Sequence, residues 1–402
     1  MKIGLISEAY PPMSGGVATS AQRVARNLVK AGNDVAVLTF ENTHDVTEQD
    51  LLVREEDMGV TVYRIGPFFL KNPRIPAGGV SEKYKAVLRR RAFNQMIRIL
   101  KNDMPDILLS FYVINAGFIA QLVANELKLP VVAGVRGNDI GRNIFDITRF
   151  APVYWVMDSA DAIVCVNKHL RDRLLTAYPD MDKKSLVIKN SFDLAKHGKT
   201  TDRTGARAEL VKKYNWDKED LILNFTGSLR EKKGVVTLCH ALDMINEPEA
   251  KVRLLVIGPD LGNVEKKLIG VIWDKLKEKN IIQVTGQCDR DEVPFLIAAT
   301  DAGCFPSSDD GMANGVLENM ALGLPVIGTE IFGDVLTNLH DGILIPVDDT
   351  QALVEAIRTL YADRNLISGM GKNAIDTIAH EFTPEIETGA YIRLFNKILK
   401  RR

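Results

Sequence analysis

Two carboxylates and a glycine-containing loop stand close together in the segment from Pro306 to Ile327. An apolar run typical of a strand, Asp301–Phe305, precedes this segment, and a helix is expected to begin near Asn314. This order places Asp310 in the loop and Glu318 one turn into the helix, beside the free N–H groups and the positive end of the helix. Such a corner suits an anionic diester with sugars on both sides, because it offers amide donors to the charge and carboxylates to the hydroxyl groups.

A simpler interpretation assigns each acid a local role. Asp310 would cap the coming helix, and Glu318 would be an exposed helix acid. The two acids flank Gly311 and Asn314 within a single strand–loop–helix connection. That combination favours a binding site over two unrelated surface acids.

A second loop, Phe225–Val235, carries three cations between glycines: Arg230, Lys232 and Lys233. Arg230 and Lys233 follow a strand-like run and lead into a helical pattern, a position from which they can neutralise a diphosphate. A solvated run of charge is the usual explanation for an isolated Lys-Lys pair. Here the strand–loop–helix setting favours phosphate binding.

Two loops in the first half of the chain are further candidates. In the segment Glu8–Ser20 the pair Gly15-Gly16 lets a ligand approach the backbone at the start of a helix, although the dinucleotide pattern G-x-G-x-x-G is absent. A plain turn with a capping hydroxyl is the alternative.

Ligands of open α/β sheets bind beyond the carboxyl ends of the strands, where the segment 134–143 brings three polar residues: Arg136, Asn138 and Asp139. A structural salt bridge between Arg136 and Asp139 is the alternative.

Short apolar runs alternate with amphipathic segments along the whole chain, which predicts parallel sheets covered by helices on both faces. At 402 residues the chain suits two domains. We expect two doubly wound α/β domains, residues 1–195 and 206–380, joined by a polar linker at 196–205, with a ligand cleft beside it. The last segment, 381–402, is expected to form a helix that packs across the junction. The expected strands are Lys2–Ser7, Asp34–Phe40, Val60–Ile65, Asp106–Phe111, Pro130–Val135, Ala162–Val166, Leu186–Lys189, Leu221–Phe225, Val252–Ile257, Ile281–Val284, Ala302–Phe305, Pro325–Gly328 and Ile343–Ile345.

Composition excludes several classes of protein. A net charge of −1 provides no global basic field for nucleic acid. The six histidines and four scattered cysteines form no ligand spacing, so no metal is expected, and the thiols are typical of a reducing compartment. No apolar stretch is long enough for a bilayer, and the N-terminus reads as a strand, so a cytoplasmic location is expected.

An expected helix, Glu82–Lys101, has a basic face formed by Lys83, Arg90, Arg91, Arg98 and Lys101. This face would suit an anionic membrane or an acidic acceptor, although a solvated helix face is the commoner explanation.

Taken together, the four loops resemble those of the retaining glycosyltransferases of family 4, whose GT-B fold has two facing Rossmann-like domains. The resemblance covers essentially the full length of the chain. It rests on the N-terminal glycine loop, the G-x-x-R-x-K-K-G loop at 227–234, the acid-glycine-acid segment at 310–318, and the run Leu339–Pro346. It implies transfer of a sugar from a nucleotide-diphosphate sugar to a hydroxyl of a glycan, lipid or small molecule, with no metal and no cofactor.

The resemblance also implies roles for individual residues. Lys233 and Arg230 would hold the donor diphosphate, Asp310 would contact a hydroxyl of the transferred sugar, and Glu318 would hold the nucleotide ribose. The residues expected to be catalytic are Asp310, Lys233, Arg230 and Asp139. The expected donor-binding residues are Gly15, Gly16, Ser228, Arg230, Lys233, Asp310, Gly311, Met312, Ala313, Asn314, Leu317 and Glu318. The acceptor side would be formed by Arg136, Asn138 and Asp139.

Three positions depart from the family pattern. Asp310 stands where the family has Glu, Ser228 stands where Arg is common, and Gly137-Asn138-Asp139 replaces a His-Asp pair. Two alternative functions stay open, the first from the shared two-domain plan and the second from Asp310 and the missing His. One is a nucleotide-sugar epimerase of the same fold, and the other is a sugar-nucleotide-binding protein with weak catalysis.

Overall fold

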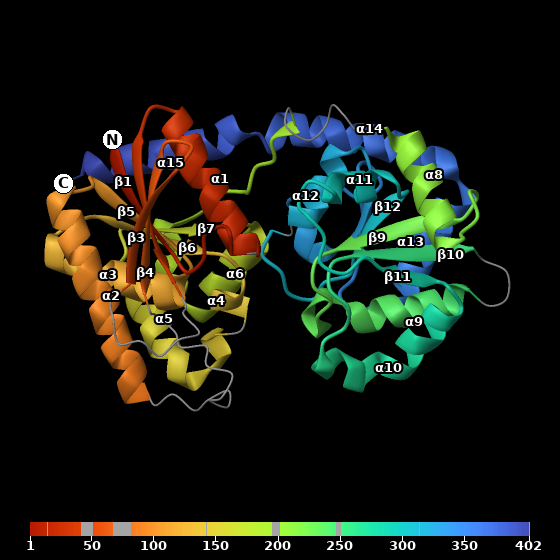
Figure 1. Ribbon diagram of the computed structural model, residues 1–402, viewed down its shortest axis with the longest axis horizontal. Helices are drawn as coiled ribbons and strands as arrows, with labels where there is room; N and C mark the ends of the chain where they lie inside the picture. Colours follow the sequence, from red (N-terminus) through yellow and green to blue (C-terminus); the bar gives the residue numbers. More distant parts are fainter. Residues whose placement is uncertain are drawn as a thin grey trace. The chain divides into compact units, whose positions relative to one another are not determined.

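The computed structural model describes residues 1–13, 15–41, 51–66, 82–141, 143–194, 202–246, 251–312 and 314–401, without the side chains of residues 51, 82–85 and 138. The chain divides into two compact units (Figure 1): Met1–Asn190 with Glu385–Arg402, and Ser191–Pro384. The chain therefore leaves the first unit after Asn190, five residues before the domain boundary at residue 195 that the sequence predicted. Most of the expected linker, residues 196–201, lies outside the described residues, and the helix α8 (Arg203–Tyr214) already begins within its last part.

The first unit is built on an eight-stranded sheet with the order β3-β4-β2-β1-β5-β6-β7-β8. Seven strands run parallel, and β3 at one edge pairs antiparallel with β4. Apart from Lys2 at the start of β1, the residues of the central strands β1, β5 and β6 are buried, which explains their nearly continuous apolar sequences. The strands are β1 (Lys2–Ser7), β2 (Asp34–Phe40), β3 (Leu51–Asp57), β4 (Val60–Gly66), β5 (Ile107–Phe111), β6 (Val131–Val135), β7 (Ala162–Cys165) and β8 (Ser185–Val187).

Helices cover this sheet, and the last helix of the chain takes part in its core. The apolar face of α15 buries Tyr391 and Phe395 among the side chains of β1, β2 and β5. The expected helix across the junction thus packs within the first unit, because its apolar stripe belongs to that core. The helices are α1 (Gly16–Lys30), α2 (Glu82–Asn102), α3 (Phe118–Leu127), α4 (Asn138–Gly141), α5 (Ile147–Ser159), α6 (Lys168–Ala177) and α15 (Pro384–Leu399).

The second unit has a six-stranded parallel sheet with the order β11-β10-β9-β12-β13-β14. The prediction of two doubly wound α/β domains is therefore confirmed. The strands are β9 (Leu221–Thr226), β10 (Val252–Ile257), β11 (Ile282–Val284), β12 (Ala302–Phe305), β13 (Val326–Thr329) and β14 (Gly342–Ile345). The helices besides α8 are α9 (Val235–Ile245), α10 (Asn263–Glu278), α11 (Val293–Ala298), α12 (Asn314–Ala321), α13 (Thr350–Ala362) and α14 (Arg364–Glu381).

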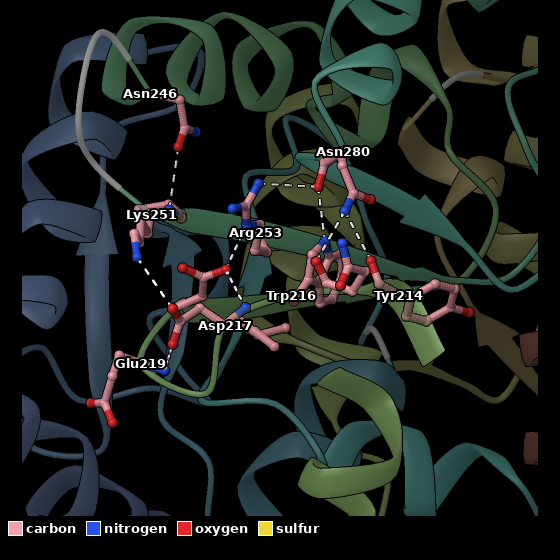
Figure 2. Close-up of polar contacts among 12 residues, drawn as sticks. Tyr214, Trp216, Asp217, Glu219, Asn246, Lys251, Arg253 and Asn280 are labelled. Carbon is pink, nitrogen blue, oxygen red and sulfur yellow. Dashed lines mark hydrogen bonds and ion pairs between the residues drawn. The ribbon is translucent and has the colours of Figure 1, made fainter. Parts of the chain in front are cut away.

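Polar side chains fix the amino-terminal edge of this second sheet (Figure 2). Arg253 donates to the buried carboxylate of Asp220 at 2.7 Å and to the carbonyl of Asn280 at 3.2 Å. The indole N–H of Trp216 donates to the same carbonyl at 2.8 Å, and Asn280 returns a bond to the carbonyl of Tyr214 at 2.9 Å. These bonds join the end of α8 to the starts of β10 and β11. These bonds hold the amino-terminal edge of the sheet in place. The loops described below leave the opposite, carboxyl-terminal edge.

Candidate functional site

The two predicted donor loops of the second unit follow neighbouring strands. β9 and β12 lie side by side, and the strand order continues in opposite directions from them. Such a switch point is where open α/β sheets bind ligands, because the loops that leave the two strands diverge there. The loop 227–234 leaves β9, and the loop 306–312 leaves β12.

A close backbone contact holds these two loops together. Gly234 has φ of 73°, and a Cβ built on it would lie 1.8 Å from the carbonyl oxygen of Pro306. Beside this contact, the backbone N–H groups of Ser308 and Asp309 donate to the carbonyl of Lys232 at 2.9 and 3.2 Å. Only glycine fits at position 234, both for its backbone conformation and for the space.

The ion pair between Lys233 and Asp310 is the central polar contact of the site. The ammonium group of Lys233 donates to Oδ2 of Asp310. The side chain of Asp310 is 12% exposed and that of Lys233 is 23% exposed. The pair is therefore shielded from most of the bulk water, and the Lys233 side chain is the more exposed of the two.

Arg230, the second predicted cation, points toward a different acid. Its guanidinium lies 3.9 Å from Oε2 of Glu265, which is buried in the first turn of α10. The Arg230 side chain itself is 59% exposed and could turn toward a ligand at modest cost. Sequence reasoning missed Glu265, although an acid in the first turn of a helix is the pattern that signals such a contact.

A buried amide network positions α12, the helix that carries Glu318. Asn224 on β9 donates to the side-chain oxygens of Thr300 and Asn319 at 2.8 and 2.7 Å. Asn319 returns a bond to Asn224 at 3.2 Å and also donates to the carbonyl of Gly315 at 2.8 Å. Because these amides are fully buried and bonded to one another, they fix the helix against the sheet.

The remaining donor residues lie on or near α12. Gly311, Met312 and Leu317 are buried, whereas Asn314 and Glu318 are half-buried, and Ala313 lies outside the described residues. Burial raises the pKa of Glu318, and the charge of Arg290 partly opposes this effect. Ser228 is exposed in the β9 loop. The structure thus gathers the expected acids, cations and helix start at one edge of the second sheet.

The predicted residues of the first unit lie in loops beyond the carboxyl ends of β1 and β6, on the two sides of the switch point between β1 and β5. Gly15 has φ of 133° at the start of α1, and a Cβ there would meet no heavy atom within 4 Å. Gly15 and Gly16 are exposed. Glycine is therefore needed at position 15 for the backbone conformation, and the surrounding space is open.

Asp139 is fully buried and bonded to backbone amides. Its carboxylate accepts from the N–H groups of Gly137 at 2.8 Å, Arg136 at 3.0 Å and Val113 at 3.3 Å. Loss of hydration raises the pKa of Asp139 to about 6, although the amide bonds oppose this effect. In this geometry Asp139 holds the loops after β5 and β6 in place. Its predicted catalytic role stays a prediction.

Arg136 does not form the alternative salt bridge with Asp139. Its guanidinium stacks 3.7 Å from the ring centre of Phe111, and it donates to the hydroxyl of Tyr391 at 2.7 Å. A longer bond of 3.4 Å reaches the side chain of Asn190. Arg136 thus links β5 and β6 to α15, and the side chain of Asn138 lies outside the description.

Glu8 is a site residue that sequence reasoning missed. It directly follows β1, and its Oε1 accepts from the N–H of Asn115 at 3.2 Å. Burial is the main cause that raises its pKa, and the nearby charge of Asp139 adds to it. The signal in the sequence is an acid directly after a buried strand, which places the acid at the carboxyl edge of the sheet.

Two family models match the chain, one on each half. The model for glycosyltransferase family 4 matches residues 14–196, and the model for group 1 glycosyl transferases matches residues 206–377. The chain belongs to the family 4, group 1 glycosyltransferases. It is 25% identical to the putative teichuronic acid biosynthesis glycosyltransferase TuaC of Bacillus subtilis, over 89% of this chain and 88% of that protein. It is also 25% identical to the alpha-monoglucosyldiacylglycerol synthase of Streptococcus pneumoniae, over 81% and 70% of the two chains.

Solved structures show the same fold as this glycosyltransferase. Anabaena Alr3699/HepE in complex with UDP superposes with a TM-score of 0.75 and 15% identity, over 99% of this chain and 100% of that chain. The sucrose-phosphate synthase of Thermosynechococcus elongatus superposes with a TM-score of 0.77 and 18% identity, over 100% and 99% of the chains. The predicted GT-B fold is therefore confirmed.

Two further observations concern the surroundings of the glycosyltransferase site. In the described part of the chain, no three His, Cys, Asp or Glu side chains are grouped to hold a metal ion. None of the helices described combines the length and apolarity that crossing a bilayer requires. On α2, Arg90, Arg98 and Lys101 are exposed and Arg91 is half-buried, while the side chain of Lys83 lies outside the description.

Proposed function

We propose that this glycosyltransferase moves a sugar from a nucleotide-diphosphate sugar to an acceptor hydroxyl with retention of the anomeric configuration and without a metal ion. The observation that carries the proposal is the Lys233–Asp310 pair, which joins the β9 and β12 loops beside the start of α12. It brings a cation for phosphate oxygens next to a carboxylate for a sugar hydroxyl. The Anabaena neighbour was solved with UDP and with UDP-glucose, so a UDP-sugar is the first donor to test.

In the proposed reaction, the bond between the anomeric carbon and the diphosphate oxygen breaks as the diphosphate leaves. Lys233, Arg230 once turned from Glu265, and the N–H groups at the start of α12 would stabilise the negative charge that grows on the diphosphate. A departing phosphate oxygen would take the proton of the acceptor hydroxyl, which then bonds to the same face of the sugar. Each preorganised donor of this kind typically contributes about 3 kcal/mol to the transition state.

Asp310 would accept a hydrogen bond from a hydroxyl of the transferred sugar, and Glu318 would bind the ribose of the nucleotide. Burial raises the pKa of Glu318, and a hydrogen bond to a ribose hydroxyl is stronger in such a partly dehydrated place than in water. Gly15 and Gly16 of the first unit have no side chains, so the sugar donor or the acceptor substrate would be able to contact the backbone there. Arg136 and Asp139 would shape the acceptor side by holding the loops after β5 and β6.

A cytoplasmic enzyme is part of the proposal. None of the four cysteines forms a disulfide, and three of them are buried, as expected in a reducing compartment. The exposed cations of α2 would bring the enzyme to an anionic membrane or acceptor. The acceptor class is proposed to be a glycan, a lipid-linked acceptor or a small molecule.

The test begins with thermal shifts for a panel of UDP-, GDP- and ADP-sugars, because a ligand stabilises the folded protein according to its affinity. The donor that binds is then incubated with chelator present, first alone and then with candidate acceptors, and followed by NMR. Release of the nucleoside diphosphate with an axial product bond from an axial donor supports the proposal. An inverted product or an epimerised donor without transfer contradicts it, and so does a strict need for a divalent ion.

A further inference from the structure

A pocket of about 380 Å³ lies on the first unit, between the edge strand β8 and the helix α15. Asp161, Lys184 and Ser185 line it, and these residues precede or begin β7 and β8. The lining then continues along the whole of β8 to Val187 and Ile188. Gly15, Gly16, Arg136 and Asp139, the predicted first-unit residues whose side chains are described, do not line it, so this pocket is separate from that site.

Five cations and one acid line this pocket. On the α15 side, Arg393, Lys397 and Arg401 are spaced four residues apart, so they share one face of the helix and its end. On the β8 side are Lys183 and Lys184. Arg393, Lys397, Arg401 and Lys183 are exposed, and Lys184 is half-buried.

None of these five cations forms an ion pair with a carboxylate of the described residues. Lys184 donates instead to the carbonyls of Asp158 and Ala160 at the end of α5. The acid of the pocket, Asp161, accepts from the backbone N–H of Val131 at 2.9 Å. The pocket therefore keeps a strong excess of positive charge, which is the opposite of the paired charges elsewhere on this unit, such as Arg23 with Glu387.

The floor of the pocket is apolar. Leu186 and Ile188 come from β8 and the residue just after it, and Ala390, Leu394 and Ile398 come from α15. Leu394 and Ile398 are part of the buried core of the unit, so the floor is fixed by packing. A ligand of this pocket would place its charge among the cations at the rim and an apolar portion on the floor.

We propose that this pocket is a second binding site, for a ligand that carries a phosphate or diphosphate group. A diphosphate has several negative charges and many acceptor oxygens, and arginine and lysine side chains are the residues that bind such groups most strongly. A single carboxylate would leave most of the five cations without a partner. The phosphate would be that of a soluble metabolite or of an anionic lipid headgroup, and the two sources share the same contacts.

The experiment measures two probes on the full chain at low salt: pyrophosphate by calorimetry, and phosphatidylglycerol vesicles by co-sedimentation. The test variant is Arg393→Glu/Lys397→Glu. The matched control is Lys30→Glu/Lys212→Glu, which reverses two exposed charges at the ends of α1 and α8. The milder variant Arg393→Gln/Lys397→Gln covers the case in which the charge reversal disturbs folding, and thermal unfolding checks all three.

We expect about a tenfold loss of affinity for at least one probe in the test variant and almost none in the control. Loss for pyrophosphate alone identifies a soluble ligand, and loss for vesicles alone identifies a lipid headgroup. Pyrophosphate could also bind at the donor loops. The variant Lys233→Ala separates the two sites, because it should weaken binding at the donor loops and leave binding in this pocket unchanged. The proposal is overturned if neither probe binds the wild-type chain, or if the test variant binds both probes as the control does.

Discussion

Gly234 and Pro306 approach so closely that a Cβ on Gly234 would lie 1.8 Å from the Pro306 carbonyl oxygen. We expect Gly234→Ala to separate the β9 and β12 loops and to reduce donor binding at least about tenfold. The left-handed backbone alone costs about 1–2 kcal/mol for alanine, and the clash adds to that cost. Gly270→Ala is the control, because a Cβ there meets no atom within 4 Å in the middle of α10. Equal donor affinity and melting temperature in the two variants would contradict the prediction.

Lys233→Ala is expected to lower turnover by about 100-fold, because it removes one preorganised cation from the leaving diphosphate. The substitution also leaves the carboxylate of Asp310 without its ion-pair partner. Steady-state rates of nucleotide release with a saturating donor measure the effect. Lys212→Ala, which removes an exposed lysine at the end of α8, is the control and should retain wild-type turnover. A Lys233→Ala enzyme as fast as this control would exclude the proposed role.

Asp310→Ala is expected to weaken binding of the nucleotide sugar more than binding of the free nucleoside diphosphate. The reason is that Asp310 is proposed to contact the sugar, while its loss frees the Lys233 ammonium for the phosphates. We expect about a tenfold loss for the sugar adduct and little change for the nucleotide. Calorimetry with both ligands measures this difference, and Asp310→Asn separates the charge from the shape of the side chain. An equal loss for the two ligands would assign Asp310 to general support of the loops.

Most strands of the two sheets could be predicted, because the central ones are buried on both faces. Their apolar runs, such as Ile107–Phe111, are continuous and differ from the amphipathic helices around them. β3 (Leu51–Asp57) was missed, because an edge strand faces solvent and carries the charges Arg54, Glu55 and Glu56. Those charges protect the edge from pairing with other chains, and they also hide the strand from a search for apolar runs.

The loops of the site could be predicted, but not the partners of each side chain. The sequence order placed Lys233 and Asp310 after two strands, and the sheet order then made those strands neighbours. Nothing in the sequence showed that Arg230 would turn to Glu265. Likewise, the bond between Arg136 and Tyr391 joins residues 255 positions apart, and only the packing of α15 brings them together.

Asp139 gives the first unit a pH dependence whose sign can be stated. Burial raises the pKa of its carboxyl from 3.8 to about 6 in the folded state, so the folded chain keeps a proton that the unfolded chain has already released. The contribution of this group to the free energy of unfolding is therefore fully present below about pH 4. It falls as the pH rises to about 6, by at most about 3 kcal/mol.

The variant Asp139→Asn tests this because its amide does not titrate. We expect the difference in unfolding free energy, wild type minus variant, to decrease between about pH 4 and pH 6 and to be constant above pH 7. Hydrogen exchange in denaturant, read by mass spectrometry on peptides of β5 and β6, follows the first unit separately from the second. Glu8→Gln is measured alongside, because Glu8 also has a raised pKa and contacts the same loop. A difference that is flat from pH 4 to pH 7 would mean that the amide bonds, and not burial, govern the charge of Asp139.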